Sequence, residues 1–145
     1  MSDNATFYIS DPSLIGSKLF SSLTELKQCS EISEGENATG LLLRIEKAEL
    51  RMRFMPPDKV EEHLRSLEQF ARQNISKADL LTLVLSRLRY RRFVIGCVIE
   101  PEYDDDGTVQ EFVFKFNALL NGLLFTFDTL FDYDGEALAG RFAAP

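Results

Sequence analysis

The sequence has no tryptophan, a single histidine and only two cysteines among its 145 residues. The histidine, His63, has no second histidine four residues further on, so the helical motif of zinc proteases is absent. A G-x-S-x-G nucleophile motif and a glycine-rich phosphate loop are absent as well. The sequence therefore favours a binding protein over an enzyme, and we expect neither catalytic residues nor a cofactor.

Long apolar runs and a secretion signal are also missing. No stretch of about 18 consecutive apolar residues occurs, so the sequence excludes a membrane-spanning helix. The first residues, MSDNATFYISDPS, are polar and acidic where a signal peptide needs a basic segment followed by an apolar one. Cys29 and Cys97 lie far apart, and two free thiols are typical of the reducing cytosol. We therefore expect a cytoplasmic protein that does not bind membranes.

Length and composition favour one globular domain that spans residues 1–145. Hydrophobic residues make up 45% of the chain, and twelve Phe and four Tyr predict an aromatic core. The net charge of −7 is unevenly distributed, because residues 41–92 carry an excess of bases and residues 93–145 a large excess of acids. An acidic C-terminal third repels nucleic acid, so we expect no nucleic-acid partner.

Apolar periodicity and turn signals predict alternating strands and helices. Strands are predicted at residues 5–9, 93–100, 123–128 and 137–139, and residues 41–54 form either one interrupted strand or a hairpin. Helices are predicted at residues 14–27, from Pro56 to Ala71, at 76–90 with Ser76 and Asp79 as a capping box, and at 108–122 with Thr108 and Glu111 as another. Residues 30–40 are predicted to be a loop. This order predicts an α+β fold with a mainly antiparallel sheet and three or four helices.

Residues 109–120 fit two structures. The phenylalanines of the stretch EFVFKF alternate as in a strand, whereas the wider segment has apolar residues at helical spacing. The predicted cap at Thr108 and the helix stop at Asn121–Gly122 favour the helix. A helix leaves Phe114 outside the buried stripe, where it is either a second packing contact or an exposed anchor.

Two acidic turns stand out in the C-terminal third: EPEYDDDG at residues 100–107 and DYDG at residues 132–135. In an EF-hand frame that begins at Glu102 and has Gly107 as its sixth residue, the twelfth is Val113, which cannot coordinate calcium. We therefore predict no metal site. We interpret the turns as a surface on which tyrosines anchor a basic protein and carboxylates speed its association. The predicted contact residues are Glu100, Glu102, Tyr103, Asp104, Asp105, Asp106, Asp132, Tyr133 and Asp134.

Three stretches of the C-terminal half, within residues 93–140, are VIGCVIEPEYDDDG, LNGLLF and LFDYDGEAL. In these stretches the chain resembles small bacterial immunity proteins. Proteins of this kind are antidotes to secreted toxins, including type VI and polymorphic toxin effectors. The resemblance implies a cytosolic protein that binds one cognate toxin domain and covers its active site. Many such toxins have basic clefts, and an acidic surface can occupy such a cleft.

Two other functions fit the same sequence. One is a secretion chaperone for an effector protein, which would dimerise through a hydrophobic helix and bind extended segments in apolar grooves. The other is a small metal- or nucleotide-dependent enzyme that uses the acidic turns as ligands. The sequence is compatible with a monomer or a dimer, and with acidic turns that lie together or apart.

Overall fold

Eight strands form one antiparallel sheet in the computed structural model, which describes residues 2–144. The strands are β1 (Asp3–Ile9), β2 (Leu26–Glu34), β3 (Asn37–Ile45), β4 (Glu49–Phe54), β5 (Phe93–Glu100), β6 (Leu123–Thr126), β7 (Thr129–Phe131) and β8 (Ala137–Gly140). The helices are a 3-10 helix η1 (Pro12–Leu14), α1 (Ser17–Ser22), α2 (Pro57–Asn74), α3 (Ala78–Arg89) and α4 (Thr108–Leu119). The strand order β2-β3-β4-β5-β1-β6-β7-β8 places β5 and β1 in the middle. The predicted α+β class is therefore confirmed, as a single domain.

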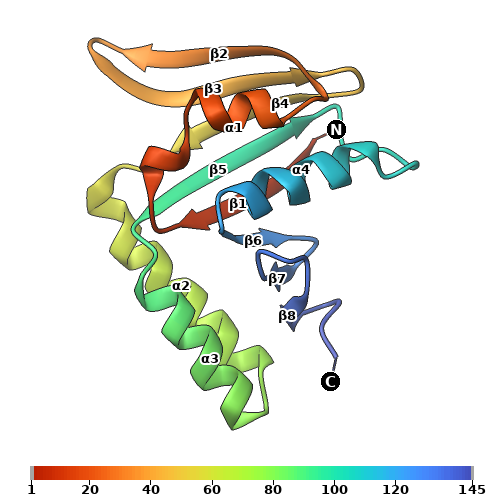
Figure 1. Ribbon diagram of the computed structural model, residues 1–145. Coiled ribbons are helices and arrows are strands. Elements are labelled where there is room, and N and C mark those ends of the chain that lie inside the picture. The colour runs from red at the N-terminus through yellow and green to blue at the C-terminus, as the bar shows by residue number, and fades with distance from the viewer. Residues whose placement is uncertain (1, 145) are drawn as a thin grey trace.

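Helices pack against both faces of the sheet (Figure 1). Helices α1 and α4 lie on one face, where Phe7 of β1 packs against Phe116 of α4 with ring centroids 5.0 Å apart. Helices α2 and α3 form a hairpin that packs on the other face, against the end of β1 and strands β6–β8. Successive side chains of a strand point to opposite faces, so Phe7 and Ile9 belong to the first core and Tyr8 to the second.

The structure confirms the helix predicted over residues 108–122, although it ends at Leu119. Its buried side chains follow helical spacing, and Phe114 packs edge-on against Phe131 with centroids 4.9 Å apart. Phe114 is therefore a second packing contact. The hairpin alternative is confirmed for residues 41–54, which form part of β3 and all of β4.

The N-terminal third differs from the prediction. The helix predicted at residues 14–27 ends at Ser22, and β2 begins at Leu26. The loop predicted at residues 30–40 is part of the β2–β3 hairpin, which turns at Gly35 with a φ of +64°. β2 is an edge strand that is exposed along most of its length, so it lacks the apolar alternation of a buried strand. Backbone pairing with β3 determines its structure.

The strand predicted at residues 123–128 is instead a hairpin of two short strands, β6 and β7. Phe127 and Asp128 both have a φ of +54°, as the two central residues of a tight β-hairpin turn require. Asn and Gly usually occupy such positions, so the turn is hard to see in the sequence. The two predicted capping boxes are wrong as well, because Lys77 and Gly107 occupy the N-cap positions of α3 and α4, with no side-chain capping bond at either position.

The two cysteines lie in different environments, and both thiols are free. Cys97 is buried in the first core, and burial raises the pKa of its thiol to about 12, so the thiol stays protonated and unreactive. Cys29 is exposed on β2. Within residues 2–144, none of the helices combines the length and the apolar character that crossing a membrane requires.

Candidate functional site

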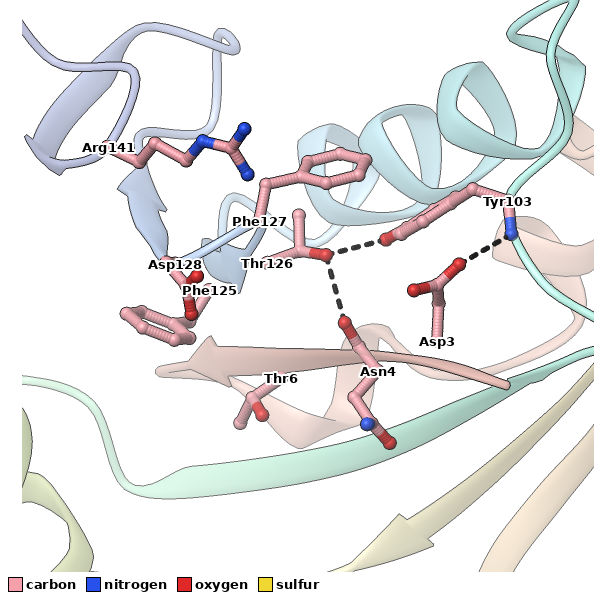
Figure 2. A pocket seen from close by; sticks show the side chains of 9 residues that line it. All are labelled: Asp3, Asn4, Thr6, Tyr103, Phe125, Thr126, Phe127, Asp128 and Arg141. Atoms are coloured by element: carbon pink, nitrogen blue, oxygen red, sulfur yellow. Dashed lines mark hydrogen bonds between the residues drawn. The ribbon is translucent and has the colours of Figure 1, made fainter. Parts of the chain in front are cut away.

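The first acidic turn, residues 100–107, connects the end of β5 to the start of α4 (Figure 1). It lies at the end of the sheet where β1 begins, since Ile99 of β5 pairs with Asp3 of β1. Asp3 also accepts a hydrogen bond of 2.9 Å from the backbone N–H of Tyr103 (Figure 2). The turn is therefore attached to the two central strands of the sheet.

Tyr103 fixes the turn from inside. Its ring packs on Phe127 with centroids 4.6 Å apart, and its hydroxyl lies 2.8 Å from Thr126 Oγ1 (Figure 2). Thr126 donates its hydroxyl proton to the carbonyl of Asn4 at 2.9 Å, so Tyr103 is the donor to Thr126. Burial raises the pKa of the Tyr103 phenol, which keeps it protonated for this bond. The structure thus gives Tyr103 a supporting role, whereas the sequence predicted a contact residue.

Asp104 and Asp106 hold the beginning of α4. Asp104 accepts a hydrogen bond from the N–H of Val109 at 2.9 Å. Asp106 accepts from the N–H of Thr108 at 3.1 Å and from its hydroxyl at 2.7 Å. These bonds satisfy N–H groups that the first turn of a helix leaves unpaired, and negative charge is favourable there. Two of the predicted contact carboxylates are thus occupied by the start of this helix.

Lys47, in the turn between β3 and β4, strengthens this arrangement. It forms an ion pair with Asp106, and its Nζ lies 3.7 Å from Asp104 Oδ2. The hydrogen bond from Lys47, together with those from Thr108, holds the pKa of Asp106 well below its usual range. The same bond to Asp106 raises the pKa of Lys47. Both groups are therefore charged at neutral pH, and the β3–β4 turn holds the acidic turn from one side.

The other three carboxylates of the turn, Glu100, Glu102 and Asp105, are exposed. None of them forms an ion pair within residues 2–144. Their backbone is held in place by the contacts of Tyr103 and by Asp104 and Asp106, the two capping aspartates that bond to the first turn of α4. A surface that is ordered before binding loses less conformational entropy on association. The first turn is therefore suited to binding cationic groups of a partner.

The second acidic turn, between β7 and β8, is organised differently. Asp132 is only 4% exposed and forms an ion pair with Arg87 of α3. Asp132 also accepts a hydrogen bond from the N–H of Tyr133 at 2.9 Å, and Asp134 accepts one from the N–H of Glu136 at 3.0 Å. Asp132 therefore has a structural role, whereas Tyr133 and Asp134 are exposed.

The two acidic turns lie at opposite ends of the sheet. The first lies where β1 begins, because Ile99 pairs with Asp3. The second follows Phe131 of β7, which pairs with Leu124 of β6. The adjacent Leu123 pairs with Tyr8, so the second turn lies where β1 ends. Between the two turns, α4, β6 and β7 each carry the chain from one end of the sheet to the other, so the turns lie at opposite ends. The sequence is compatible with turns that lie together or apart, and the structure places them apart, as two separate surfaces.

The arginines around the end of α3 contribute to the second turn. Their tertiary contacts were not predicted from the sequence. Arg87 pairs with Asp132, and Arg91 donates hydrogen bonds to the carbonyl of Asn121 at 2.8 Å and to the hydroxyl of Ser10 at 3.3 Å. These contacts join α3 and the segment that follows it to three other parts of the chain, so the arginines position the α2–α3 hairpin against the sheet.

The geometry of the acidic turns does not suit a metal ion. In the described part of the chain, no three His, Cys, Asp or Glu side chains are placed so that they could hold one. In the EF-hand frame, Glu102, Asp104 and Asp106 would be the first ligands, but Asp104 and Asp106 bond to the start of α4. The turn therefore presents its free carboxylates outward.

A basic surface on β4 is a feature that was not predicted from the sequence. Arg51 and Arg53 alternate with the buried Leu50 and Met52, so the arginines point away from the face that α4 covers. Both arginines are exposed. The alternation of charged and apolar residues in this segment predicted a strand, and it is also the signal for a charged sheet face. No family model, curated protein or solved structure matches this chain.

Proposed function

We propose that this protein is an immunity protein that binds a cognate toxin domain and blocks its active site. The contact surface is the first acidic turn, with Glu100, Glu102 and Asp105 as the residues that meet the toxin. The partner has a basic surface, and the two proteins meet in the cytoplasm. The second acidic turn is not part of this surface, because it lies at the other end of the sheet.

One observation carries this proposal: the turn is supported by contacts to other parts of the chain, while three of its carboxylates form no ion pair with any residue from 2 to 144. Lys47, Asp3 and Thr126, from three different parts of the chain, hold the turn through Tyr103 and the capping aspartates. Isolated carboxylates on a flexible loop would lose conformational entropy when a partner binds, and this loss opposes binding. A supported acidic turn avoids most of that cost. It also attracts a basic protein over a distance and so speeds association.

The test uses a basic toxin domain captured by pull-down with this protein from its native cell. The variant Glu100→Lys/Glu102→Lys/Asp105→Lys should abolish protection of cells that express the toxin. Reversal of three contact charges should weaken binding at least about 100-fold, which corresponds to about 2.8 kcal/mol because each 1.4 kcal/mol is a factor of ten. Affinity of the unmodified protein, measured by calorimetry, should fall steeply with added salt because salt screens exposed charges.

The matched control reverses three exposed glutamates elsewhere, Glu31, Glu34 and Glu36 of the β2–β3 hairpin. This control changes the net charge equally, so a general effect of charge would appear in both variants. We expect full protection from the control variant. Full protection by the turn variant, or a toxin complex whose contacts avoid residues 100–106, would refute the proposal.

A further inference from the structure

One part of the sheet is not covered by a helix. Helices α2 and α3 pack against Tyr8, Leu123 and Leu130, at the β1–β8 side of their face. The same face of β4 and β5 carries the exposed Arg51 and Arg53, and no residue of β3 or β4 belongs to the core beneath α2 and α3. This region of the sheet is therefore open to a partner.

A glycine makes the open face hollow. Gly96 interrupts the apolar run of β5, and it pairs with Arg53 on one side and with Thr6 on the other. Paired residues of antiparallel strands point to the same face, so Arg53, Gly96 and Thr6 form one row. A Cβ atom at Gly96 would meet nothing within 4 Å. The result is a hollow of about 440 Å³, which Arg51 and Arg53 border.

The hollow carries an excess of positive charge. Glu49 is the acidic partner of both Arg44, at 3.0 Å, and Arg51, at 3.6 Å. Arg53 forms no ion pair within residues 2–144. Arg44 and Arg51 thus share one carboxylate and Arg53 has none within residues 2–144, on a protein whose net charge is −7. Guanidinium groups bind carboxylates with two parallel hydrogen bonds, so the free ones favour an acidic ligand.

The row continues from the hollow into an apolar groove. Thr6 pairs with Phe125 of β6, and both residues line a second hollow of about 320 Å³ beside α2. Phe70 of α2 packs edge-on against Phe125 with ring centroids 5.1 Å apart and forms the wall of this groove. From Arg53 to Phe125 the row spans three strand spacings, about 14 Å. An extended segment of about four residues has this length.

We propose that this groove binds an extended acidic segment of a partner protein. We define the groove by Arg51, Arg53, Gly96, Thr6, Phe70 and Phe125. Carboxylates of the segment bind Arg51 and Arg53, its backbone lies across Gly96 and Thr6, and an apolar side chain packs against the rings of Phe70 and Phe125 in the second hollow. Single-stranded nucleic acid fits less well, because such sites stack bases on exposed aromatic rings and the arginine end of the groove has none. This proposal does not depend on the immunity function, which uses carboxylates of this chain.

The test is an NMR titration of the full-length, ¹⁵N-labelled protein with the capped peptide EEGLF. We expect saturable shifts at the amides of Arg53, Gly96, Thr6 and Phe125. The peptide QQGLF, which lacks the carboxylates, should bind at least tenfold more weakly. The peptide EEGGG, which lacks the apolar side chains, should leave the amide of Phe125 unshifted.

Three variants locate the site on the protein. Arg51→Gln/Arg53→Gln should weaken binding of EEGLF at least tenfold. Gly96→Val fills the hollow without changing charge and should abolish binding, while circular dichroism shows an unchanged fold. The matched control Arg65→Gln/Arg72→Gln removes two exposed arginines of α2 outside the groove and should bind as the unmodified protein does.

Several results would overturn the proposal. They are equal binding of QQGLF, unchanged binding by the Arg51→Gln/Arg53→Gln variant, shifts confined to other surfaces, and no saturable shift at millimolar peptide. A dimer in sedimentation velocity that Gly96→Val dissociates would assign this face to a second copy of the chain instead. The variant Glu100→Lys/Glu102→Lys/Asp105→Lys should still bind the peptide, so failure of the immunity proposal and failure of this one are distinguishable.

Discussion

Replacement of Thr126 by Val tests how the first acidic turn is supported. Thr126 is 2% exposed, and its hydroxyl donates to the carbonyl of Asn4 and accepts from the phenol of Tyr103. Valine has nearly the same shape, so the substitution removes two hydrogen bonds without creating a cavity. Each bond contributes about 1 kcal/mol, so we expect the free energy of unfolding to fall by about 2 kcal/mol.

Urea unfolding followed by far-UV circular dichroism measures this change. With an m value of about 2 kcal/mol/M for a chain of this size, the midpoint should fall by about 1 M urea at an unchanged slope. Tyr103→Phe removes only one of the two bonds and should cost about 1 kcal/mol. The double variant should lose less than the sum of the two, because both single changes remove the same Tyr103–Thr126 bond.

Hydrogen exchange extends the test to the turn itself. In Thr126→Val, the amides of residues 102–107 should exchange faster than in the unmodified protein, because the turn opens more often. The control Thr82→Val changes an exposed threonine of α3 and should leave stability within about 0.5 kcal/mol. A Thr126→Val variant as stable as this control, with unchanged exchange in the turn, would refute the claim that this contact holds the turn.

Two further changes have outcomes that the structure determines. Arg87→Met leaves the buried Asp132 without its ion-pair partner and should destabilise the fold by about 2 kcal/mol, less than for a fully buried pair because the Arg87 side chain is 31% exposed. The control Arg65→Met breaks an exposed ion pair and should cost under about 0.5 kcal/mol in the same thermal or urea unfolding experiment. Equal costs for the two variants would contradict the structural role of the Arg87–Asp132 pair. Burial lowers the pKa of His63 below its ordinary 6.5, so near and below that pH the unfolded chain binds a proton that the folded protein does not. The free energy of unfolding should therefore fall as the pH falls through this range. His63→Phe should flatten this decline, since the chain has no other histidine. The same dependence of unfolding free energy on pH in the variant would contradict this reasoning.

Local sequence predicted helices and strands correctly where the side-chain pattern agrees with burial. The apolar run of β5 and the helical stripe of α4 were both predicted, because each buries a continuous set of side chains. Edge strand β2 was predicted as part helix and part loop, because its side chains are mostly exposed and only the pairing with β3 makes it a strand. The turn at Phe127–Asp128 was missed for a similar reason, since packing of β6 against β7 imposes a backbone conformation that these residues rarely adopt.

The candidate site was also predictable from the sequence only in part. The acidic character of residues 100–106 was visible in the sequence, but the exposure of Glu100, Glu102 and Asp105 and the structural use of Asp104 and Asp106 were not. Whether a carboxylate is exposed or bonded, and to which group, depends on residues far away in the chain.

Sequence alone determined the fold class, the uneven charge and the lack of familiar catalytic motifs, because composition and short-range periodicity carry this information. Tertiary structure alone decided that the two acidic turns lie apart and that an uncovered basic face exists. Both outcomes depend on which strands pair and which faces the helices cover. Strand pairing joins residues such as Thr6 and Phe125 that are distant in the chain, and no local pattern records such a contact.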